Sequence, residues 1–174
     1  MVQKVMAKTN TPNMKHKLFL LLAVLFSLAA HAQEDTLSMA DQYVDKEFVI
    51  VRSAKKYADA LQTARTAATR LKIKLDLRGL KPNKAIGLSW DKKTCETDWF
   101  ESPCYVARGR YDDGEYVSIE YSTAYTGFAE GYYIVIIAGG PQGDDAVKQS
   151  LRKARTVYKD AYAKRTKVYI GCMH

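Results

Sequence analysis

The sequence predicts an α+β domain in which a strand–helix–strand unit occurs twice around an insertion. Two observations support this prediction. The hydrophobic pattern of a strand, a helix and a strand is found over residues 48–77 and again, in the same order, over residues 132–171. The apolar positions of the second helix also repeat those of the first at a constant offset of 90 residues. Two such units typically build a split βαβ-βαβ (ferredoxin-like) fold, an antiparallel four-stranded sheet with both helices on one face.

The first unit begins with a β-branched and aromatic run, Phe48–Val51, which favours a strand. In residues 55–72 the apolar side chains recur every three or four positions, as they do on one face of a helix. Residues 73–77 then alternate between apolar and charged, the pattern of a half-buried strand. The predicted apolar stripe of the helix comprises Tyr57, Leu61, Ala64, Ala68 and Leu71.

The second unit repeats this order near the C-terminus. The run Tyr132–Ile137 predicts a strongly apolar strand, closed by the Gly-Gly-Pro sequence at 139–141. Asp144 and Asp145 are acids of the kind that favour a helix N-terminus, and residues 167–171 are expected to supply the last strand. The predicted stripe of this helix comprises Val147, Leu151, Ala154, Tyr158 and Ala161.

Residues 81–131, between the two units, are predicted to be an insertion. The turn signal Asp112-Asp113-Gly114 lies between two runs of strand-like composition, 105–110 and 115–121, and predicts an inserted β-hairpin. The hairpin could extend the sheet or fold over the face that the helices leave uncovered. We favour extension of the sheet.

The first 32 residues have the features of a secretory signal peptide. A 13-residue apolar run, residues 18–30, follows Lys15 and Lys17 and precedes a small-residue cleavage site ending at Ala32. The run is shorter than the roughly 20 residues that a membrane-spanning helix needs. We therefore expect a mature protein that is periplasmic or secreted, without a membrane span. With Met1 or Met14 as the start, the expected division is a signal peptide over 1–32, a flexible lead-in over 33–46 and one domain over 47–174.

Loss of the signal peptide lowers the formal net charge from +8 to +4, because residues 1–32 contain four lysines and no acids. This weakens the case for a nucleic-acid partner, and we expect none. The remaining basic residues concentrate in 52–84 and 148–167, whereas 91–130 is acidic. The two interpretations are solvated helix faces beside an acidic loop region, or a basic surface that meets an anionic polymer of the envelope.

Three cysteines are present. In an oxidising compartment Cys95 and Cys104, nine positions apart, are expected to form a disulfide. Cys172 is then left over, either as a buried thiol or paired with another chain.

Two short motifs resemble a known family. Val49–Ala54 reads V-I-V-R-S-A and Ile134–Gly140 reads I-V-I-I-A-G-G, and each precedes a helical pattern. In this the chain resembles the SPOR domain, the sporulation-related repeat of bacterial envelope proteins, whose motif is close to V-x-V-G-S-F. The resemblance implies the split βαβ fold and binding of peptidoglycan glycan strands through the sheet face. The chain departs from the family at Arg52, Ala54 and Ile50, where a glycine, an aromatic and a polar residue are usual.

Few residues could support catalysis. The one histidine after the signal peptide is His174, the last residue, so neither a Ser-His-Asp site nor a zinc site with several histidines is expected. Glu120 lacks an identified second carboxylate for glycoside hydrolysis. The glycine-rich run 139–143 lacks the Lys-Ser/Thr pair of a phosphate-binding loop. We expect a protein that is not an enzyme and has no cofactor and no metal site.

Aromatic side chains are the best candidates for binding, because sugar rings pack on them while their polar tips form hydrogen bonds. The leading prediction is a module that binds peptidoglycan or another envelope glycan. The alternative is a protein-interaction module, an inhibitor or assembly factor, that uses the disulfide-pinned loop 95–104 with Asp98, Trp99 and Phe100 as an interface anchor. The candidate ligand-binding residues are Arg52, Ser53, Trp90, Trp99, Tyr105, Arg108 and Tyr116.

Overall fold

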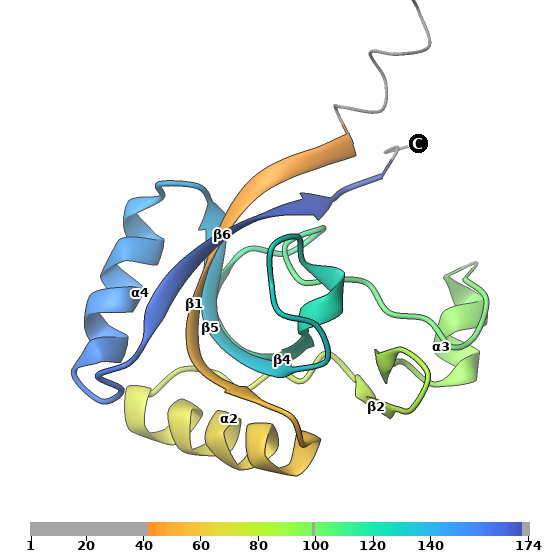
Figure 1. The fold of residues 1–174 in the computed structure, drawn as a ribbon, viewed down its shortest axis with the longest axis horizontal. Helices are drawn as coiled ribbons and strands as arrows, with labels where there is room; N and C mark the ends of the chain where they lie inside the picture. The colour runs from red at the N-terminus through yellow and green to blue at the C-terminus, as the bar shows by residue number, and fades with distance from the viewer. Residues whose placement is uncertain (1–41, 99, 172–174) are drawn as a thin grey trace, which may run out of the picture. The chain divides into compact units, whose positions relative to one another are not determined.

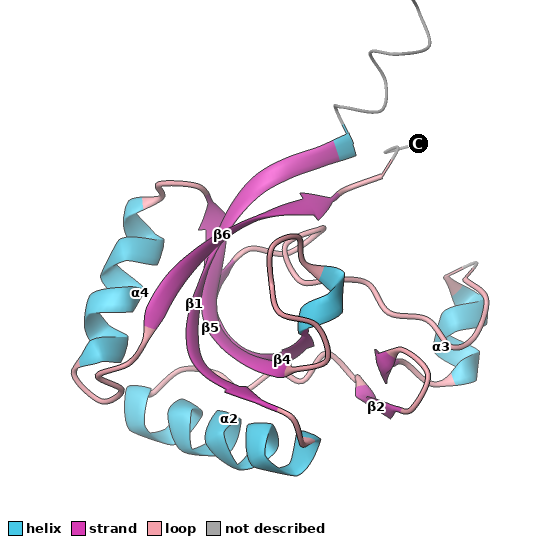
Figure 2. Ribbon diagram, in the orientation of Figure 1, coloured by secondary structure: helices cyan, strands magenta, loops and turns pink. Residues whose placement is uncertain are grey.

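The computed structural model describes residues 42–98 and 100–171, which form an α+β domain (Figures 1 and 2). The expected signal peptide, most of the lead-in, Trp99, Cys172 and His174 lie outside the described residues. The elements in chain order are β1 (Tyr43–Ala54), α2 (Tyr57–Leu71), β2 (Lys81–Asn83), β3 (Gly87–Ser89), α3 (Lys92–Thr97), β4 (Gly114–Tyr121), the 3₁₀ helix η2 (Ser122–Ala124), β5 (Tyr133–Pro141), α4 (Asp145–Arg155) and β6 (Tyr162–Tyr169).

One antiparallel sheet contains four of the strands, in the order β4-β5-β1-β6. The helix α2 follows β1 and α4 follows β5, so each helix leaves one of the two central strands. β2 and β3 form a separate two-stranded hairpin, which lies with α3 away from the two long helices (Figure 2).

Both long helices pack on one face of the sheet. Val49, Val135 and Ile137 from the central strands share a core with the buried residues of α2 and α4. The face of α2 that packs on the sheet differs from the predicted apolar stripe, because Tyr57, Leu61 and Ala68 of that stripe are only half-buried. The α2 residues that do reach the core are Ala60, Ala64, Ala67 and Leu71, mostly alanines, which lets the helix approach the sheet closely. α4 ends at Arg155, so Tyr158 and Ala161 lie beyond it.

The opposite face of the sheet is also covered. Phe48, Ile50 and Ile136 form a second core with Tyr125, against which Phe128 packs. The chain on either side of β4, residues 105–110 and 122–132, therefore lies over this face, which the resemblance to the SPOR domain had implied to be open. We call these two segments the cover. Gly139 allows the packing, because a Cβ there would lie 2.4 Å from the Phe48 ring.

The predicted strand 73–77 and the predicted hairpin are both corrected. Within 73–77 only Leu75 forms a β-bridge, to Val117. β4 shifts register against β5 between Glu115 and Ser118, and Val117 there donates to the carbonyl of Lys74 and accepts from Asp76 N–H, each at 2.8 Å. The edge of the sheet is therefore β4 itself, with 73–77 beside it as an extended segment.

The first arm of the predicted hairpin, 105–110, contains no strand. The Arg108 side chain turns onto the sheet and donates to main-chain carbonyls of β4, so this segment crosses the face instead of pairing along the edge. The lead-in is shorter than predicted, because residues 43–46 belong to β1 and pair with the end of β6. Within residues 42–98 and 100–171 no helix has the length and apolar character to cross a membrane.

The predicted disulfide is confirmed. Cys95 and Cys104 are bonded, and both are buried, at 0% and 6% exposure. The bond ties the short helix α3 to the segment that leads into the cover of the sheet.

Candidate functional site

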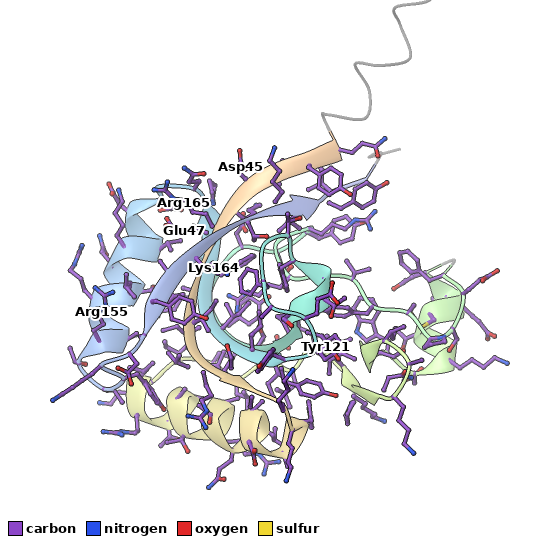
Figure 3. The ribbon with its side chains drawn as sticks, viewed as in Figure 1. Asp45, Glu47, Tyr121, Arg155, Lys164 and Arg165 are labelled. Atoms are coloured by element: carbon purple, nitrogen blue, oxygen red, sulfur yellow. A yellow bond between two sulfur atoms is a disulfide. The ribbon has the colours of Figure 1, made fainter. Side chains whose placement is uncertain are left out.

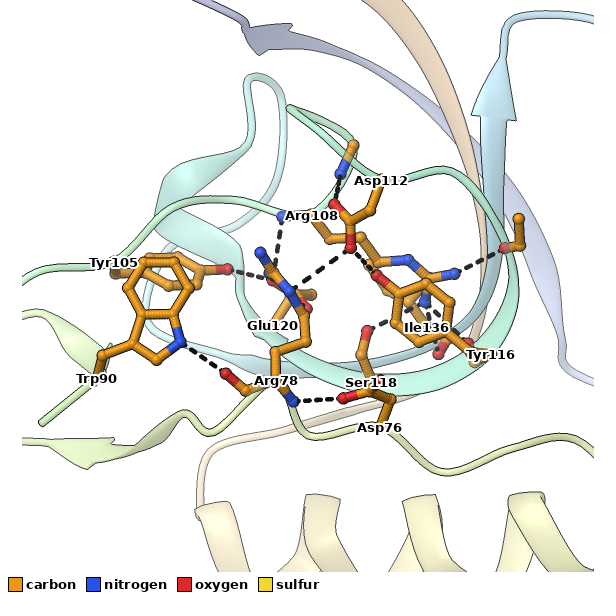
Figure 4. Close-up of polar contacts among 12 residues, drawn as sticks. Asp76, Arg78, Trp90, Tyr105, Arg108, Asp112, Tyr116, Ser118, Glu120 and Ile136 are labelled. Carbon is orange, nitrogen blue, oxygen red and sulfur yellow. Dashed lines mark hydrogen bonds and ion pairs between the residues drawn. The ribbon is translucent and has the colours of Figure 1, made fainter. Parts of the chain in front are cut away.

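A buried polar network lies between the sheet and its cover (Figure 4). Its centre is Glu120 of β4, whose side chain is fully buried. Arg78 Nη1 lies 3.2 Å and 3.0 Å from the two carboxylate oxygens, and the Tyr105 hydroxyl donates to Oε2 at 2.6 Å. The Tyr125 hydroxyl and the Arg108 main-chain N–H donate to the same Oε2, at 3.2 Å and 3.3 Å. Every hydrogen-bond partner identified for Glu120 is therefore a donor.

Arg108 is the second buried charge, with an exposure of 0%. Its Nη1 donates to the carbonyls of Tyr116 at 2.9 Å and Ile136 at 3.3 Å and to Ser118 Oγ at 3.0 Å, while Nη2 donates to the Gly114 carbonyl at 2.8 Å. The guanidinium lies 3.5 Å from the centre of the Tyr116 ring. Burial lowers the pKa of Arg108. Since Nη1 and Nη2 donate to main-chain oxygens of β4 and β5, Arg108 fastens the cover to the sheet.

Asp112 completes the network. The Tyr116 hydroxyl donates to Asp112 Oδ2, which also lies 3.6 Å from Arg78 Nε. Burial alone would lower the pKa of Arg78, but the Glu120 and Asp112 carboxylates raise it. Burial and the facing Glu120 raise the pKa of the Tyr105 phenol well above its usual value. Arg78 thus faces both carboxylates, Arg108 binds main-chain oxygens, and the tyrosines remain protonated donors.

The predicted site residues divide into three groups: three residues of the buried network, the two tryptophans, and two residues at the end of β1. Tyr105, Arg108 and Tyr116 come together in the buried network, where their polar groups bind other parts of the chain. Trp90 is half-buried beside it and donates from Nε1 to the Arg78 carbonyl at 2.6 Å. Trp99 lies outside the described residues.

Arg52 and Ser53, the third group, are exposed but do not share a face of the sheet. Arg52 pairs with Val135, which belongs to the helix-side core, and Ser53 pairs with Ile134, which belongs to the opposite core. Directly paired residues project to the same side. Ser53 therefore projects from the covered face, and Arg52 from the helix side.

Ser53 lines an accessible pocket of about 160 Å³ beside β6. Lys164 Nζ lies 4.4 Å from the Phe128 ring centre, and Lys55 Nζ lies 3.6 Å from that of Tyr132. In Figure 3, Lys164 lies on the side of β6 that faces the cover, whereas Glu47 and Arg165 lie toward α4. The residues that line this pocket are Ser53, Ser122, Phe128, Ala129, Tyr132, Ile134, Tyr162 and Lys164.

A second pocket, of about 370 Å³, adjoins the first, since Phe128 lines both. At its outer end the rings of Tyr43 and Tyr169 are 5.2 Å apart, and the Arg110 guanidinium lies 5.2 Å from the Tyr169 ring centre. We call the two pockets together the β6 groove. The lining residues of the second pocket are Tyr43, Thr123–Phe128, Glu130, Lys167 and Tyr169.

The β6 groove gathers the exposed aromatic surface of the domain. The exposed large hydrophobic side chains of the described residues are all tyrosines, and three of the four line the groove: Tyr43 at 48%, Tyr162 at 40% and Tyr169 at 42%. The fourth, Tyr111, lines neither pocket. Two lysines, Lys164 and Lys167, line the groove together with one acid, Glu130, and the exposed Asp45 is the cross-strand neighbour of Lys167.

Sequence reasoning placed only Ser53 in this groove. It assigned the region before residue 167 to the end of the second helix pattern, so Tyr162 and Lys164 were not seen as one face of a strand. Their spacing of two residues was the available signal.

The described residues contain no group of three His, Cys, Asp or Glu side chains placed to hold a metal ion. In comparisons with known proteins, the sequence matches no family model, no curated protein and no solved structure. The resemblance to the SPOR domain therefore rests on the two short motifs alone.

Proposed function

We propose that the domain has the split βαβ-βαβ fold. The strand order β4-β5-β1-β6 supports this, because α2 connects β1 to β4 and α4 connects β5 to β6. Each connection joins two parallel strands that have one antiparallel strand between them, as in the split βαβ unit. The residues between α2 and β4 are then an insertion in the first connection, and they supply the first segment of the cover, whereas residues 122–132 follow β4.

We propose that the chain is an exported, non-enzymatic binding module of the bacterial cell envelope, and that it binds glycan strands of peptidoglycan in the β6 groove. One observation supports this most strongly: accessible tyrosines and lysines are concentrated along a single groove. The apolar faces of sugar rings pack on tyrosine, whose hydroxyl bonds to sugar hydroxyls. Lysines suit the carboxylates that peptidoglycan carries.

The shape of the groove favours a polymer over a single sugar. Its two pockets adjoin at Phe128 and follow β6 from Tyr162 to Tyr169. Successive sugar units can occupy the two pockets, with Lys164 beside one and Lys167 beside the other. Ser53 adds a hydroxyl to the lining of the smaller pocket.

The buried network supports the groove from below. Tyr125 lines the larger pocket and donates its hydroxyl to Glu120. The Thr166 hydroxyl donates to the Thr126 carbonyl at 3.0 Å, which fixes the wall of the groove to β6. Tyr105, Arg108 and Tyr116 thus act on binding through the position of the cover.

A second candidate function is the protein-interaction module that uses loop 95–104. The observation in its favour is a third pocket, of about 620 Å³, beside the disulfide. It shares only Thr123 and Ala124 with the β6 groove.

Co-sedimentation of the mature chain, residues 33–174, with purified peptidoglycan sacculi tests the proposal. We expect the double variant Tyr43→Ala/Tyr169→Ala to weaken binding about tenfold or more, since each aromatic contact contributes about 0.5–1.5 kcal/mol. Lys164→Glu should weaken binding by a similar factor, because it replaces a cation that suits the carboxylates of peptidoglycan by an anion. Lys159→Glu changes an exposed lysine that lines neither pocket, and it is the charge-matched control for Lys164→Glu. Tyr111→Ala is the control for the tyrosine variant. Absence of sedimentation at low and moderate salt, or equal effects of variants and controls, would contradict the glycan proposal.

A further inference from the structure

The third pocket has a chemistry opposite to that of the β6 groove. It lies between the turn of the β2–β3 hairpin, the segment after α3, and η2, at the side of the domain where Figure 1 shows α3 and β2. Three half-buried aromatic residues line it, Phe100, Tyr105 and Tyr121, together with the exposed carboxylate of Glu101. None of the residues that line it is a lysine or arginine.

The walls of this pocket are fixed by contacts inside the protein. The disulfide between Cys95 and Cys104 closes the loop that carries Phe100 and Glu101. The Tyr105 hydroxyl donates to Glu120 and accepts the Tyr121 main-chain N–H at 3.2 Å. The rings of Phe100 and Tyr105 are therefore attached to elements that are themselves anchored.

The ring of Tyr121 is also fixed in position by its neighbours. Its ring lies against Gly87 so closely that a Cβ there would be 2.2 Å from it. The same ring packs against Tyr133, with 5.1 Å between the ring centres, and the Tyr133 hydroxyl donates to the Gly87 carbonyl at 3.1 Å. The pocket is thus formed before any ligand arrives, which reduces the entropy that binding must overcome.

The charge around the pocket favours a cation. Among the residues that line the pocket, the charged one is Glu101, whose side chain is exposed. Four other acids of residues 91–130 are already paired with cations of the protein: Asp112 and Glu120 with Arg78, Asp113 with Lys46 and Glu115 with Lys153. Aromatic faces attract ammonium and guanidinium groups, and a carboxylate at the rim adds to this attraction.

We propose that this pocket binds the side chain of an arginine or lysine from a basic peptide segment of a partner protein. The inference is independent of glycan binding in the β6 groove. It gives the loop 95–104 a defined partner chemistry, and it places the partner in a pocket that shares only Thr123 and Ala124 with the glycan groove. A chain with both sites would attach a basic protein to the polymer.

Titration of ¹⁵N-labelled mature chain, residues 33–174, followed by NMR chemical shifts, tests this inference. The probes are N-acetyl-arginine amide, N-acetyl-citrulline amide, which has nearly the same shape without the charge, and a five-residue peptide with one central arginine between glycines and serines. We expect shifts at Ile86, Phe100, Glu101 and Tyr121 with the arginine amide and the peptide. Binding of the citrulline probe should be weaker by about fivefold or more, which corresponds to about 1 kcal/mol.

Variants separate a specific pocket from general attraction. Glu101→Gln, which keeps the shape of the side chain, should weaken the arginine probe about three- to fivefold, as should Phe100→Leu. Glu96→Gln removes an exposed acid on α3 that does not line the pocket, and should change binding by less than about twofold. Equal binding of citrulline and arginine, equal effects of Glu101→Gln and Glu96→Gln, or no shifts in the pocket at millimolar probe would each overturn the inference. Binding of the amide without tighter binding of the peptide would overturn the assignment to a protein partner.

Discussion

Replacement of Glu120 by glutamine tests the buried network most severely. The change keeps the size of the side chain, removes its charge and turns one acceptor oxygen into an NH₂ group. Arg78, Tyr105 and Tyr125 all donate to the carboxylate, so the new NH₂ meets donors and one or more of them loses its partner. Arg78 also loses its shortest ion pair, which is only 13% exposed on the arginine side.

The expected cost is large. Breaking a buried ion pair from one side destabilises a protein by about 3–5 kcal/mol, out of the 5–15 kcal/mol that is typical of whole domains. For a domain of this size that corresponds to a fall in melting temperature of roughly 10–20 °C. The assay is urea unfolding followed by far-UV circular dichroism, with thermal unfolding as a second measurement.

Glu115→Gln is the matched control on the same strand. Glu115 binds Ser150 and Lys153 at the surface, with a side chain that is 40% exposed. It should change the free energy of unfolding by less than about 1 kcal/mol. Equal losses for the two variants, or a loss below about 1 kcal/mol for Glu120→Gln, would refute the reasoning that the network fastens the cover to the sheet.

Three further predictions follow from the same contacts. Burial raises the pKa of Tyr105 and Tyr125 above the ordinary 10.0, so the stability that these phenols contribute is present below pH 10 and is lost as the pH rises above it. Ultraviolet titration should therefore show these two phenols ionising only as the chain unfolds. Ionisation of all tyrosines before unfolding would contradict this. Hydrogen bonds from Lys74 and the Arg78 main chain lower the pKa of Asp76 below 3.8, so the stability that its carboxylate contributes is present above that pH and is lost as the pH falls further. Asp76→Asn should therefore flatten the fall in the free energy of unfolding between about pH 5 and 2. An unchanged slope in the variant would contradict this prediction. Cys95→Ser/Cys104→Ser should lower the free energy of unfolding by about 2–3 kcal/mol, from the entropy of so short a loop, and a loss well under 1 kcal/mol in denaturant unfolding would contradict the estimate.

Local patterns in the sequence predicted most of the regular elements. The β-branched runs around Val49 and Val135 are strands, and the two apolar stripes are helices, because burial on one or two faces leaves a clear periodicity. Cys95 and Cys104 were paired correctly from their number and spacing. The boundaries failed where periodicity alone is ambiguous, as at Tyr158 and Ala161, which continue the spacing of α4 after the helix has ended.

The cover of the sheet was not predictable in the same way. Residues 105–110 have strand-like composition, but the Arg108 side chain fixes them across the sheet through main-chain carbonyls of β4 and β5, and no local pattern in the sequence indicates these contacts. The prediction of a strand at 73–77 was wrong for a related reason, because β4 occupies the sheet edge. The β6 groove is formed by β1, the cover and β6 together. The local sequence around Tyr43 or Tyr162 therefore does not predict that these residues line a common groove.

The most direct test of glycan binding is an NMR titration of ¹⁵N-labelled protein comprising residues 33–174 with purified, peptide-free glycan strands of peptidoglycan. The account predicts chemical-shift changes at Ser53, Tyr132 and the β6 residues 162–169, with little change at the pocket beside the disulfide. Those shifts should shrink in Lys164→Glu and persist in Lys159→Glu. Shifts confined to residues outside the β6 groove, or no shifts at millimolar glycan, would contradict the claim that this groove is where the protein works.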